Sequence, residues 1–225
     1  MKVYPIFLNR LNEKKTVIIG GNREAERKAG ELLQRDANIT IINPTVTDLL
    51  LHHANSGKIR WIKRNFQEGD LDGAFLVIVA DYHDDTNERV YKEAENKGIL
   101  VNVMDDAAHC TFTFGSIVNR GNLNISISTS GAAPALAVRL RQRFEREFGE
   151  EYEQFLNLTK SLRKPMSRHY STFSERKKLW YELIDSDILE LLEQNRPKEA
   201  YERATEIIGE TVVNEALDSE KILSK

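Results

Sequence analysis

The chain has 225 residues, of which 40% are hydrophobic and 30% are charged, the balance of a globular protein with one sizeable core and room for a smaller appendage. Its net charge of -3 and its pI near 6.0 argue against a protein that binds nucleic acid through bulk positive charge. The single cysteine, Cys110, excludes an internal disulfide and favours a reducing compartment. The sequence has no signal-peptide pattern, and no apolar run approaches the roughly 20 residues that span a bilayer, so we expect a cytoplasmic protein with no membrane partner.

Residues 16–45 have the pattern of one β-α-β unit. Residues 16–19 are almost wholly apolar and β-branched, as expected of a strand covered on both faces, and residues 20–22, two glycines and an asparagine, interrupt them with a turn. Residues 23–35 carry apolar side chains at the spacing of one helix face, and residues 39–42 form a second buried strand that a proline ends. Such a unit binds anions, because the first turn of the helix presents unpaired N–H groups and a partial positive charge.

The turn departs in one position from the dinucleotide fingerprint, which is G-x-G-x-x-G or G-x-G-x-x-A. Residues 20–25 read Gly-Gly-Asn-Arg-Glu-Ala, so Asn22 replaces the second glycine of the fingerprint. Asparagine is the residue other than glycine that best tolerates a positive φ angle, so we expect Asn22 to keep the turn while its side chain crowds the phosphates. Asn43 stands where an acidic residue would hold the ribose of NAD, which leaves the choice between NAD and NADP open. The alternative is a Rossmann-like sheet with another ligand or none.

Strands and helices continue to alternate in the N-terminal half. We expect a helix over residues 45–55 and a strand nearer the sheet edge over residues 59–63. Residues 75–80 are the clearest buried strand, and a helix over residues 84–97 and a strand over residues 99–104 follow. This rhythm predicts a mostly parallel sheet covered by helices on both faces.

The pattern changes after Asp105. Residues 111–114 and 123–128 alternate between apolar and polar, which predicts strands with one exposed face, and residues 119–122 are typical of a hairpin turn between them. A loop rich in hydroxyl groups, residues 128–134, leads into a helix with an apolar side chain at every fourth position.

The chain from Glu151 onward is expected to be helical, because apolar stripes recur there at helical spacing. Pro165 and Pro197 are expected to mark helix breaks or first turns, since proline lacks the N–H that a helix interior needs. We therefore expect a small helical domain at this end.

Three predicted loops meet at the carboxyl edge of the sheet, over residues 20–25, 80–83 and 102–109. Asp105, in the third loop, is placed to accept a proton while a hydride leaves the same substrate, and the alternative is a solvated loop acid or a helix cap. His109 and the cysteine after it are a weak signal for a metal, and we predict no metal ligand.

Two features of the following segment can bind an anionic substrate. Residues 128–131 offer hydroxyls and helix-start amides that hold carboxylates or phosphates, and a simple turn with a helix cap is the equal alternative. The arginines of the next helix, Arg139 among them, are either a solvated face or partners of a polyanion, because guanidinium pairs well with carboxylates.

Together these motifs resemble one family, the precorrin-2 dehydrogenases, which also form the N-terminal module of bifunctional siroheme synthases. The resemblance extends over about residues 1–148 in the order and spacing of the family, and no single motif carries it. Its residues are Pro5-Ile6-Phe7-Leu8, Val17-Ile18-Ile19-Gly20-Gly21, Ala25-Glu26-Arg27-Lys28-Ala29, Asn87-Glu88-Arg89-Val90, Asn102-Val103-Met104-Asp105, Gly115-Ser116-Ile117-Val118-Asn119-Arg120-Gly121 and the segment from Ile125 to Pro134. Asn22 departs from the usual triple glycine of the family.

The resemblance implies the oxidation of precorrin-2 to sirohydrochlorin with NAD, in siroheme biosynthesis, by a homodimer. The implied fold is α/β: a Rossmann-like NAD-binding domain with a parallel sheet over residues 1–113, a short β/α dimerisation segment over residues 114–149 and a helical C-terminal domain over residues 150–225. Asp105 falls on the key aspartate of the family, proposed as a base and, in bifunctional members, as a participant in iron insertion. Thr129 falls where the synthase has a serine that can be phosphorylated. The alternative functions are a sirohydrochlorin ferrochelatase, with ferrous iron as a further partner, and a sensor that binds NAD and a tetrapyrrole without turnover.

The predicted site residues form three groups. The predicted catalytic residue is Asp105. The predicted cofactor-binding residues are Gly20, Gly21, Asn22, Arg23, Glu24, Asn43, Pro44, Thr45, Ala80, Asp81, Asn102 and Val103. The predicted substrate-binding residues, which would hold the carboxylates of precorrin-2, are Arg120, Ser128, Thr129, Ser130, Gly131 and Arg139.

Overall fold

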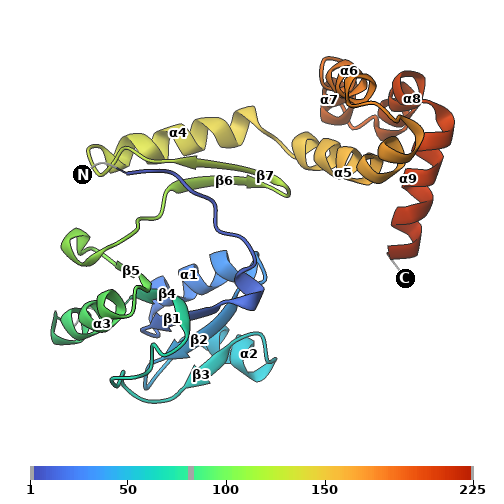
Figure 1. Cartoon of the computed structure of the whole chain (residues 1–225). Coiled ribbons are helices and arrows are strands. Elements are labelled where there is room, and N and C mark those ends of the chain that lie inside the picture. Colours follow the sequence, from blue (N-terminus) through green and yellow to red (C-terminus); the bar gives the residue numbers. More distant parts are fainter. Residues whose placement is uncertain (1–2, 81–83, 224–225) are drawn as a thin grey trace. The chain divides into compact units, whose positions relative to one another are not determined.

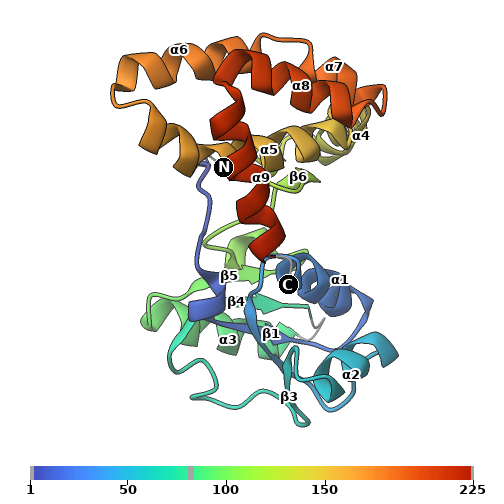
Figure 2. The same cartoon turned by 90° about the vertical axis from the view of Figure 1, so that its right-hand side faces the viewer.

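The computed structural model describes residues 3–80 and 84–223, which divide into two compact units (Figure 1; Figure 2). The first unit is Val3–Phe114, and the second begins at Gly115. Asp81, predicted from the sequence as a cofactor-binding residue, lies outside the described residues. No helix within the described ranges is long and apolar enough to cross a membrane.

Within the described part of the first unit, five strands form one parallel sheet in the order β3-β2-β1-β4-β5 (Figure 1). The strands are β1 (Lys15–Ile19), β2 (Asn38–Ile42), β3 (Arg60–Ile62), β4 (Ala74–Val79) and β5 (Leu100–Val103). The short strand β3 lies at one edge, and β1 lies in the middle between β2 and β4. The predicted parallel sheet is confirmed.

Helices cover both faces of this sheet, because successive strand residues point to opposite faces and both faces are apolar. The helices are α1 (Arg23–Leu33), α2 (Asp48–Asn55) and α3 (Asp84–Asn96). Ile18 and Ile78 share a buried cluster with residues of α1 and α2. Val17 and Val77, one position earlier in the same strands, share the opposite cluster with residues of α3. The continuous apolar runs are therefore strands buried on both sides, as the sequence predicts.

The second unit begins with an antiparallel hairpin, β6 (Ser116–Arg120) and β7 (Leu123–Ile127), on which α4 (Pro134–Glu147) packs. Arg120 and Leu123 are paired across the hairpin, so Gly121 and Asn122 form its two-residue tip. The predicted hairpin turn is confirmed.

Residues 111–114, which the sequence predicts as a strand, are instead a segment anchored on the first unit, and the prediction is wrong. The N–H of Thr111 donates to the carbonyl of Val101 at 2.9 Å, and the N–H of Val101 donates to the Thr111 hydroxyl at 2.9 Å. The rings of Phe112 and Phe114 lie edge to face, 5.1 Å apart, against the cluster that contains α1. The alternating pattern therefore comes from side chains that anchor the segment and not from strand pairing.

The remainder of the described second unit is helical, as predicted. Its helices are α5 (Glu151–His169), α6 (Phe173–Ile184), α7 (Ile188–Glu193), α8 (Pro197–Ile208) and α9 (Glu210–Leu223). Pro197 opens α8, which confirms a first turn, whereas Pro165 lies inside α5 and the predicted break there is wrong. Leu162 and Met166 flank Pro165 and are fully buried, so packing into the helical core offsets the hydrogen bond that the proline cannot donate.

Candidate functional site

The strand order places a switch point between β1 and β4. From β1 the chain runs outward to β2 and β3, then returns to β4 on the other side of β1 and continues to β5. The connections that leave the carboxyl ends of β1 and β4 therefore diverge, and in open α/β sheets ligands bind in the crevice at such a point. The N–H of Ala80 donates to the carbonyl of Ile19 at 2.8 Å, which ties the two strand ends together beneath the crevice.

The turn after β1 takes its left-handed residue from Gly20 and not from Asn22, contrary to our expectation. Gly20 has a φ of 124°, whereas Asn22 has an ordinary φ of -81°. The physical reason is that Asn22 is the N-cap of α1: its Oδ1 accepts hydrogen bonds from the N–H groups of Glu24 and Ala25, both at 3.0 Å. Its Nδ2 donates to the carbonyl of Ala80 at 2.6 Å, so the side chain reaches from the turn after β1 to the end of β4.

The loop after β2 packs directly on this turn, and the absence of a side chain at Gly21 permits the approach. A Cβ at that position would lie 1.9 Å from the carbonyl oxygen of Thr45 and 2.9 Å from Nδ2 of Asn43. The N–H of Thr47 donates to the carbonyl of Gly21 at 3.1 Å, and Nδ2 of Asn43 donates to the carbonyl of Thr45 at 2.6 Å. The structure thus brings the predicted residues 43–45 together with the glycine turn.

Two residues that hold this loop were not predicted from the sequence. The indole N–H of Trp61 donates to the carbonyl of Asn43 at 2.9 Å, and the hydroxyl of Thr47 caps α2 by accepting from the N–H of Leu50 at 3.4 Å. The cap has a local signal, since a threonine before an acidic and an apolar residue is typical of a helix start. No local pattern marks Trp61, because its hydrogen-bond partner, Asn43, is 18 residues away in the chain.

Charged side chains at the start of α1 form ion pairs. Glu24 lies 2.7 Å from Arg27, which also lies 2.7 Å from Glu31. Arg23 is exposed at the first position of the helix. The pairing of Glu24 with Arg27 offsets a negative charge that would repel an anion at the helix start, and Arg23 adds a positive one.

Asp105 is exposed in the turn that follows β5. Its φ of 62° is left-handed, a conformation that residues other than glycine keep only with support from their surroundings. The N–H of Met104 donates to the carbonyl of Val79 at 3.0 Å, which fixes the start of the turn beside the end of β4. The predicted catalytic residue is therefore carried by the same sheet edge as the glycine turn.

A histidine held between two carboxylates supports this turn, and we name Glu88, Asp106 and His109 the histidine clamp. Nδ1 of His109 lies 2.5 Å from Oδ2 of Asp106, and its Nε2 lies 2.8 Å from Oε2 of Glu88 in α3. The hydrogen bond with Asp106, aided by the charges of both carboxylates, raises the pKa of His109 above its ordinary value, and the same hydrogen bond lowers the pKa of Asp106. The clamp was not predicted, because no local pattern relates Glu88 to His109.

Asn102 and Val103 use their side chains within the first unit. Nδ2 of Asn102 donates to the carbonyl of Phe112 at 3.0 Å, and Val103 is buried in the cluster that contains α3. The thiol of Cys110 donates to the carbonyl of Val103 at 3.2 Å, and burial raises the pKa of this thiol. The role of Asn102 and Val103 in cofactor binding stays a prediction. In the part of the chain that the structure describes, no three His, Cys, Asp or Glu side chains converge as a metal site.

The two predicted arginines of the second unit differ in their surroundings. Nη2 of Arg120 donates to the carbonyl of Glu145 in the last turn of α4, at 2.8 Å, and Nη1 donates to the carbonyl of Asn119 at 2.9 Å. Arg120 therefore joins the hairpin to α4. Arg139, by contrast, is exposed on α4.

The hydroxyl-rich loop before α4 is held by its own hydrogen bonds. The hydroxyl of Ser128 accepts from the N–H of Ser130 at 3.1 Å, and the hydroxyl of Thr129 accepts from the N–H of Ala133 at 3.2 Å. Ser130 and Gly131 have left-handed φ values of 52° and 81°. The loop thus has the geometry of a turn that leads into a helix, and its role in substrate binding stays a prediction.

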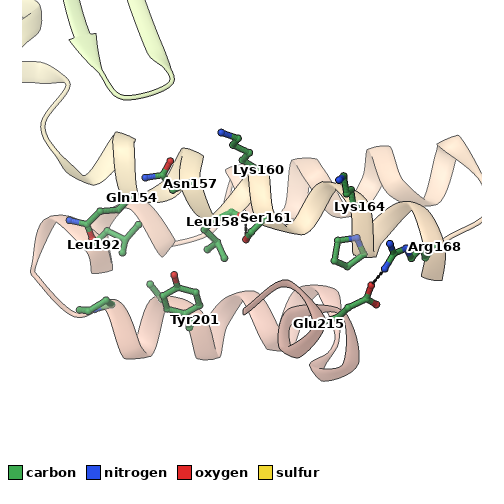
Figure 3. Close-up of a pocket in the computed structure, with 13 residues that line it drawn as sticks. Gln154, Asn157, Leu158, Lys160, Ser161, Lys164, Arg168, Leu192, Tyr201 and Glu215 are labelled. Atoms are coloured by element: carbon green, nitrogen blue, oxygen red, sulfur yellow. Dashed lines mark hydrogen bonds and ion pairs between the residues drawn. The ribbon is translucent and has the colours of Figure 1, made fainter. Parts of the chain in front are cut away.

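A cavity of about 780 Å³ lies in the helical part of the second unit, between α5 and the helices α7 to α9 (Figure 3). An ion pair joins Arg168 of α5 to Glu215 of α9 at its edge. The described residues that line the cavity are Gln154, Asn157, Leu158, Lys160, Ser161, Lys164, Pro165, Arg168, Leu192, Pro197, Ala200, Tyr201 and Glu215. None of them is a predicted site residue.

Comparisons with known proteins agree with this geometry. Residues 6–116 match the family described as "Putative NAD(P)-binding", residues 120–147 the family described as "Sirohaem biosynthesis protein central", and residues 151–207 the family described as "Sirohaem synthase dimerisation region". The chain belongs to the siroheme synthase and precorrin-2 dehydrogenase family.

Individual members of the family are similar along most of the chain. The siroheme synthase of Pseudoalteromonas translucida (strain TAC 125) is 34% identical over 189 residues, which are 84% of this chain and 40% of that protein. The siroheme synthase of Actinobacillus succinogenes is 32% identical over 207 residues, which are 92% of this chain and 43% of that protein. The chain thus spans about two fifths of the length of these curated relatives. The solved structure of SirC, precorrin-2 dehydrogenase, is 25% identical with a TM-score of 0.76 and covers 91% of this chain and 100% of that one.

Family membership confirms the predicted resemblance, the predicted fold class and a nicotinamide cofactor for the first unit. The residues present fit such a cofactor: Gly20 supplies a left-handed turn, Gly21 a close backbone approach, and α1 begins at the crevice. Asn22 is the residue that departs from the fingerprint. The match to the dimerisation region covers residues 151–207, whereas the sequence assigns dimerisation to residues 114–149, and the predicted domain boundaries stay a prediction.

Proposed function

We propose that this chain is an NAD-dependent dehydrogenase that oxidises precorrin-2 to sirohydrochlorin in siroheme biosynthesis, in the cytoplasm. The observation that carries the proposal is the likeness to SirC, precorrin-2 dehydrogenase, along the whole of that chain. The crevice between β1 and β4 supports it, because this is where an open α/β sheet takes a dinucleotide.

The glycine turn and the start of α1 would hold the pyrophosphate, and residues 43–45 would border the adenosine ribose. Gly20 supplies the left-handed turn, Gly21 lets the loop after β2 pack against that turn, and Arg23 adds a positive charge at the helix start. Bound NAD would supply the acceptor for a hydride. The choice of NAD over NADP rests on the resemblance to the family, since Asn43 favours neither.

Oxidation of precorrin-2 removes a hydride and a proton, and we assign the proton to Asp105. Its carboxylate is exposed at the sheet edge that borders the crevice. The histidine clamp and the bond from Met104 to Val79 hold the backbone of its turn, so Asp105 is presented at this edge of the sheet toward a bound substrate.

A homodimer is the proposed assembly. On the hairpin and α4, the side chains of Ile117, Leu136 and Val138 are 36%, 52% and 43% exposed, and a second copy would cover them. Arg139 lies on the same helix and would pair with carboxylates of the tetrapyrrole. Light scattering tests the assembly, and a monomer at micromolar concentration would contradict it.

The test of the reaction is an anaerobic assay with freshly made precorrin-2 and NAD, followed by the absorbance of sirohydrochlorin. We expect sirohydrochlorin to appear only with both enzyme and NAD. Ferrous iron or cobalt is added afterwards, and an enzyme-dependent metal step would add ferrochelatase activity. NAD binding without turnover would indicate a sensor, and product formation that does not require NAD would contradict the proposal.

A further inference from the structure

We propose that the Asn22 side chain occupies the place where the pyrophosphate of the cofactor would bind, and thereby weakens the affinity of the crevice for this cofactor. The inference rests on the proposed function, since it concerns the site that NAD would use. One side chain makes three hydrogen bonds there: Oδ1 accepts from the N–H groups of Glu24 and Ala25 at 3.0 Å, and Nδ2 donates to the carbonyl of Ala80 at 2.6 Å. A dinucleotide and this side chain compete for the same place.

The two N–H groups are of the kind that a pyrophosphate needs. In the dinucleotide fingerprint the second glycine lets the backbone approach the pyrophosphate, which accepts hydrogen bonds at the helix start. Asn22 occupies that position of the fingerprint, and its Oδ1 already accepts from the first turn of α1. An anion that binds there must displace Oδ1 and take over the capping of the helix.

The bond to Ala80 makes this displacement less favourable than the loss of a cap alone. It joins the turn after β1 to the end of β4, which are the two walls of the crevice. Losing a helix cap together with one hydrogen bond corresponds to about a tenfold to thirtyfold change in an equilibrium constant. Cofactor affinity is weaker by about this factor than it would be with glycine at position 22.

The turn itself does not depend on the Asn22 side chain. Its left-handed residue is Gly20, the bare Cα of Gly21 packs on Thr45, and the N–H of Thr47 donates to the carbonyl of Gly21. Because other residues make these contacts, an Asn22→Gly protein should fold and keep the crevice.

The test is calorimetric titration of the full chain with NAD, ADP and adenosine. We expect Asn22→Gly to bind NAD and ADP, which both carry a pyrophosphate, about tenfold to thirtyfold more tightly than the wild type, and to bind adenosine equally. Asn22→Asp keeps a cap acceptor but adds a negative charge, and should bind NAD about tenfold more weakly. The matched control is Thr172→Gly, which removes the N-cap of α6 in the second unit and should leave NAD affinity unchanged.

The outcomes separate this proposal from the proposed function. If the wild type binds NAD and Asn22→Gly binds it no more tightly, the role of Asn22 is overturned and the dehydrogenase stands. Adenosine binding that tightens as much as NAD binding also overturns it, because adenosine has no pyrophosphate. If neither protein binds NAD, both proposals fall.

Discussion

Replacing Gly21 with alanine tests whether the close approach at the glycine turn holds the nucleotide crevice together. The new Cβ would lie 1.9 Å from the carbonyl oxygen of Thr45, whereas ordinary contact begins at 3.4 Å, so the two must separate by about 1.5 Å. That shift breaks the 3.1 Å bond from Thr47 to the Gly21 carbonyl and strains the 2.6 Å bond from Asn43 to the Thr45 carbonyl. At about 1 kcal/mol for each hydrogen bond, and a similar cost for residual overlap, the free energy of unfolding should fall by about 2 to 4 kcal/mol.

Gly30→Ala is the matched control in the same unit. A Cβ on Gly30, inside α1, meets nothing within 4 Å, so alanine there should leave the stability unchanged or raise it by up to about 1 kcal/mol. Urea unfolding in a Trp180→Phe background follows the first unit through the fluorescence of Trp61, and calorimetry measures NAD affinity. We expect Gly21→Ala to bind NAD about tenfold more weakly or worse. A Gly21→Ala protein with the urea midpoint and NAD affinity of the wild type would refute the idea that this approach shapes the crevice.

Three further predictions concern the other parts of the first unit. Asp105→Asn fits the left-handed turn but cannot accept a proton, so turnover should fall by roughly two to four powers of ten with NAD affinity unchanged, and an unchanged rate would remove Asp105 from that role. The pKa of His109 is raised and the pKa values of Asp106 and Glu88 are lowered, so the histidine clamp is fully stabilising between 4.5, the ordinary pKa of Glu88, and 6.5, that of His109. Its contribution is lost as the pH rises through the raised pKa of His109 or falls through the lowered pKa values of the two carboxylates. Hydrogen-exchange protection of the loop after β5 should follow this window in the wild type and lose its alkaline limb in His109→Gln; equal profiles would contradict the clamp. The buried carboxylate of Glu93 accepts hydrogen bonds from two N–H groups within residues 69–71, at 3.1 and 3.3 Å. Glu93→Ala should therefore lower the free energy of unfolding, measured by urea titration, by about 2 to 4 kcal/mol. A loss below about 1 kcal/mol would show that water replaces the carboxylate.

The fold of the first unit could be predicted because the local sequence pattern of its strands and helices agrees with their packing in the core. A strand buried on both faces must be apolar at every position, and residues 75–80 have that pattern with no competing helical period. Residues 111–114 also alternate as a strand would, but Phe112 and Phe114 pack on a neighbouring core, and alternation alone cannot distinguish the two uses. Pro165 does not break α5 for a related reason: the burial of Leu162 and Met166 in the helical core outweighs the local preference of proline for a helix end.

The candidate site could be predicted where backbone chemistry decides it and not where distant side chains do. The glycines of the turn can be recognised within six residues of sequence, because the positive φ angle of Gly20 and the close contact of Gly21 with Thr45 both require glycine. The bond from Asn22 to Ala80 and the bond from His109 to Glu88 join residues 58 and 21 positions apart, and no local pattern encodes them. The sequence therefore located the crevice but not the side chains that restrain it.

The loops on the β2 side and on the β4 and β5 side of the crevice are restrained by different sets of contacts. On the β2 side, the contact of Gly21 with Thr45 and the bond from Thr47 are made by the backbone, and the neutral side chains of Asn43 and Trp61 add hydrogen bonds that do not titrate. On the β4 and β5 side, the backbone bonds from Ala80 to Ile19 and from Met104 to Val79 are joined by two side-chain restraints: the amide of Asn22, which a bound pyrophosphate would displace under our proposal, and His109, whose charge depends on pH. If a dinucleotide displaces Asn22, the end of β4 loses its side-chain bond to the turn but keeps the backbone bond from Ala80 to Ile19, while the β2 side is unchanged. Substitutions of Asn22 and His109 should therefore alter affinity and turnover without unfolding the unit, whereas Gly21→Ala should weaken affinity and also destabilise the unit.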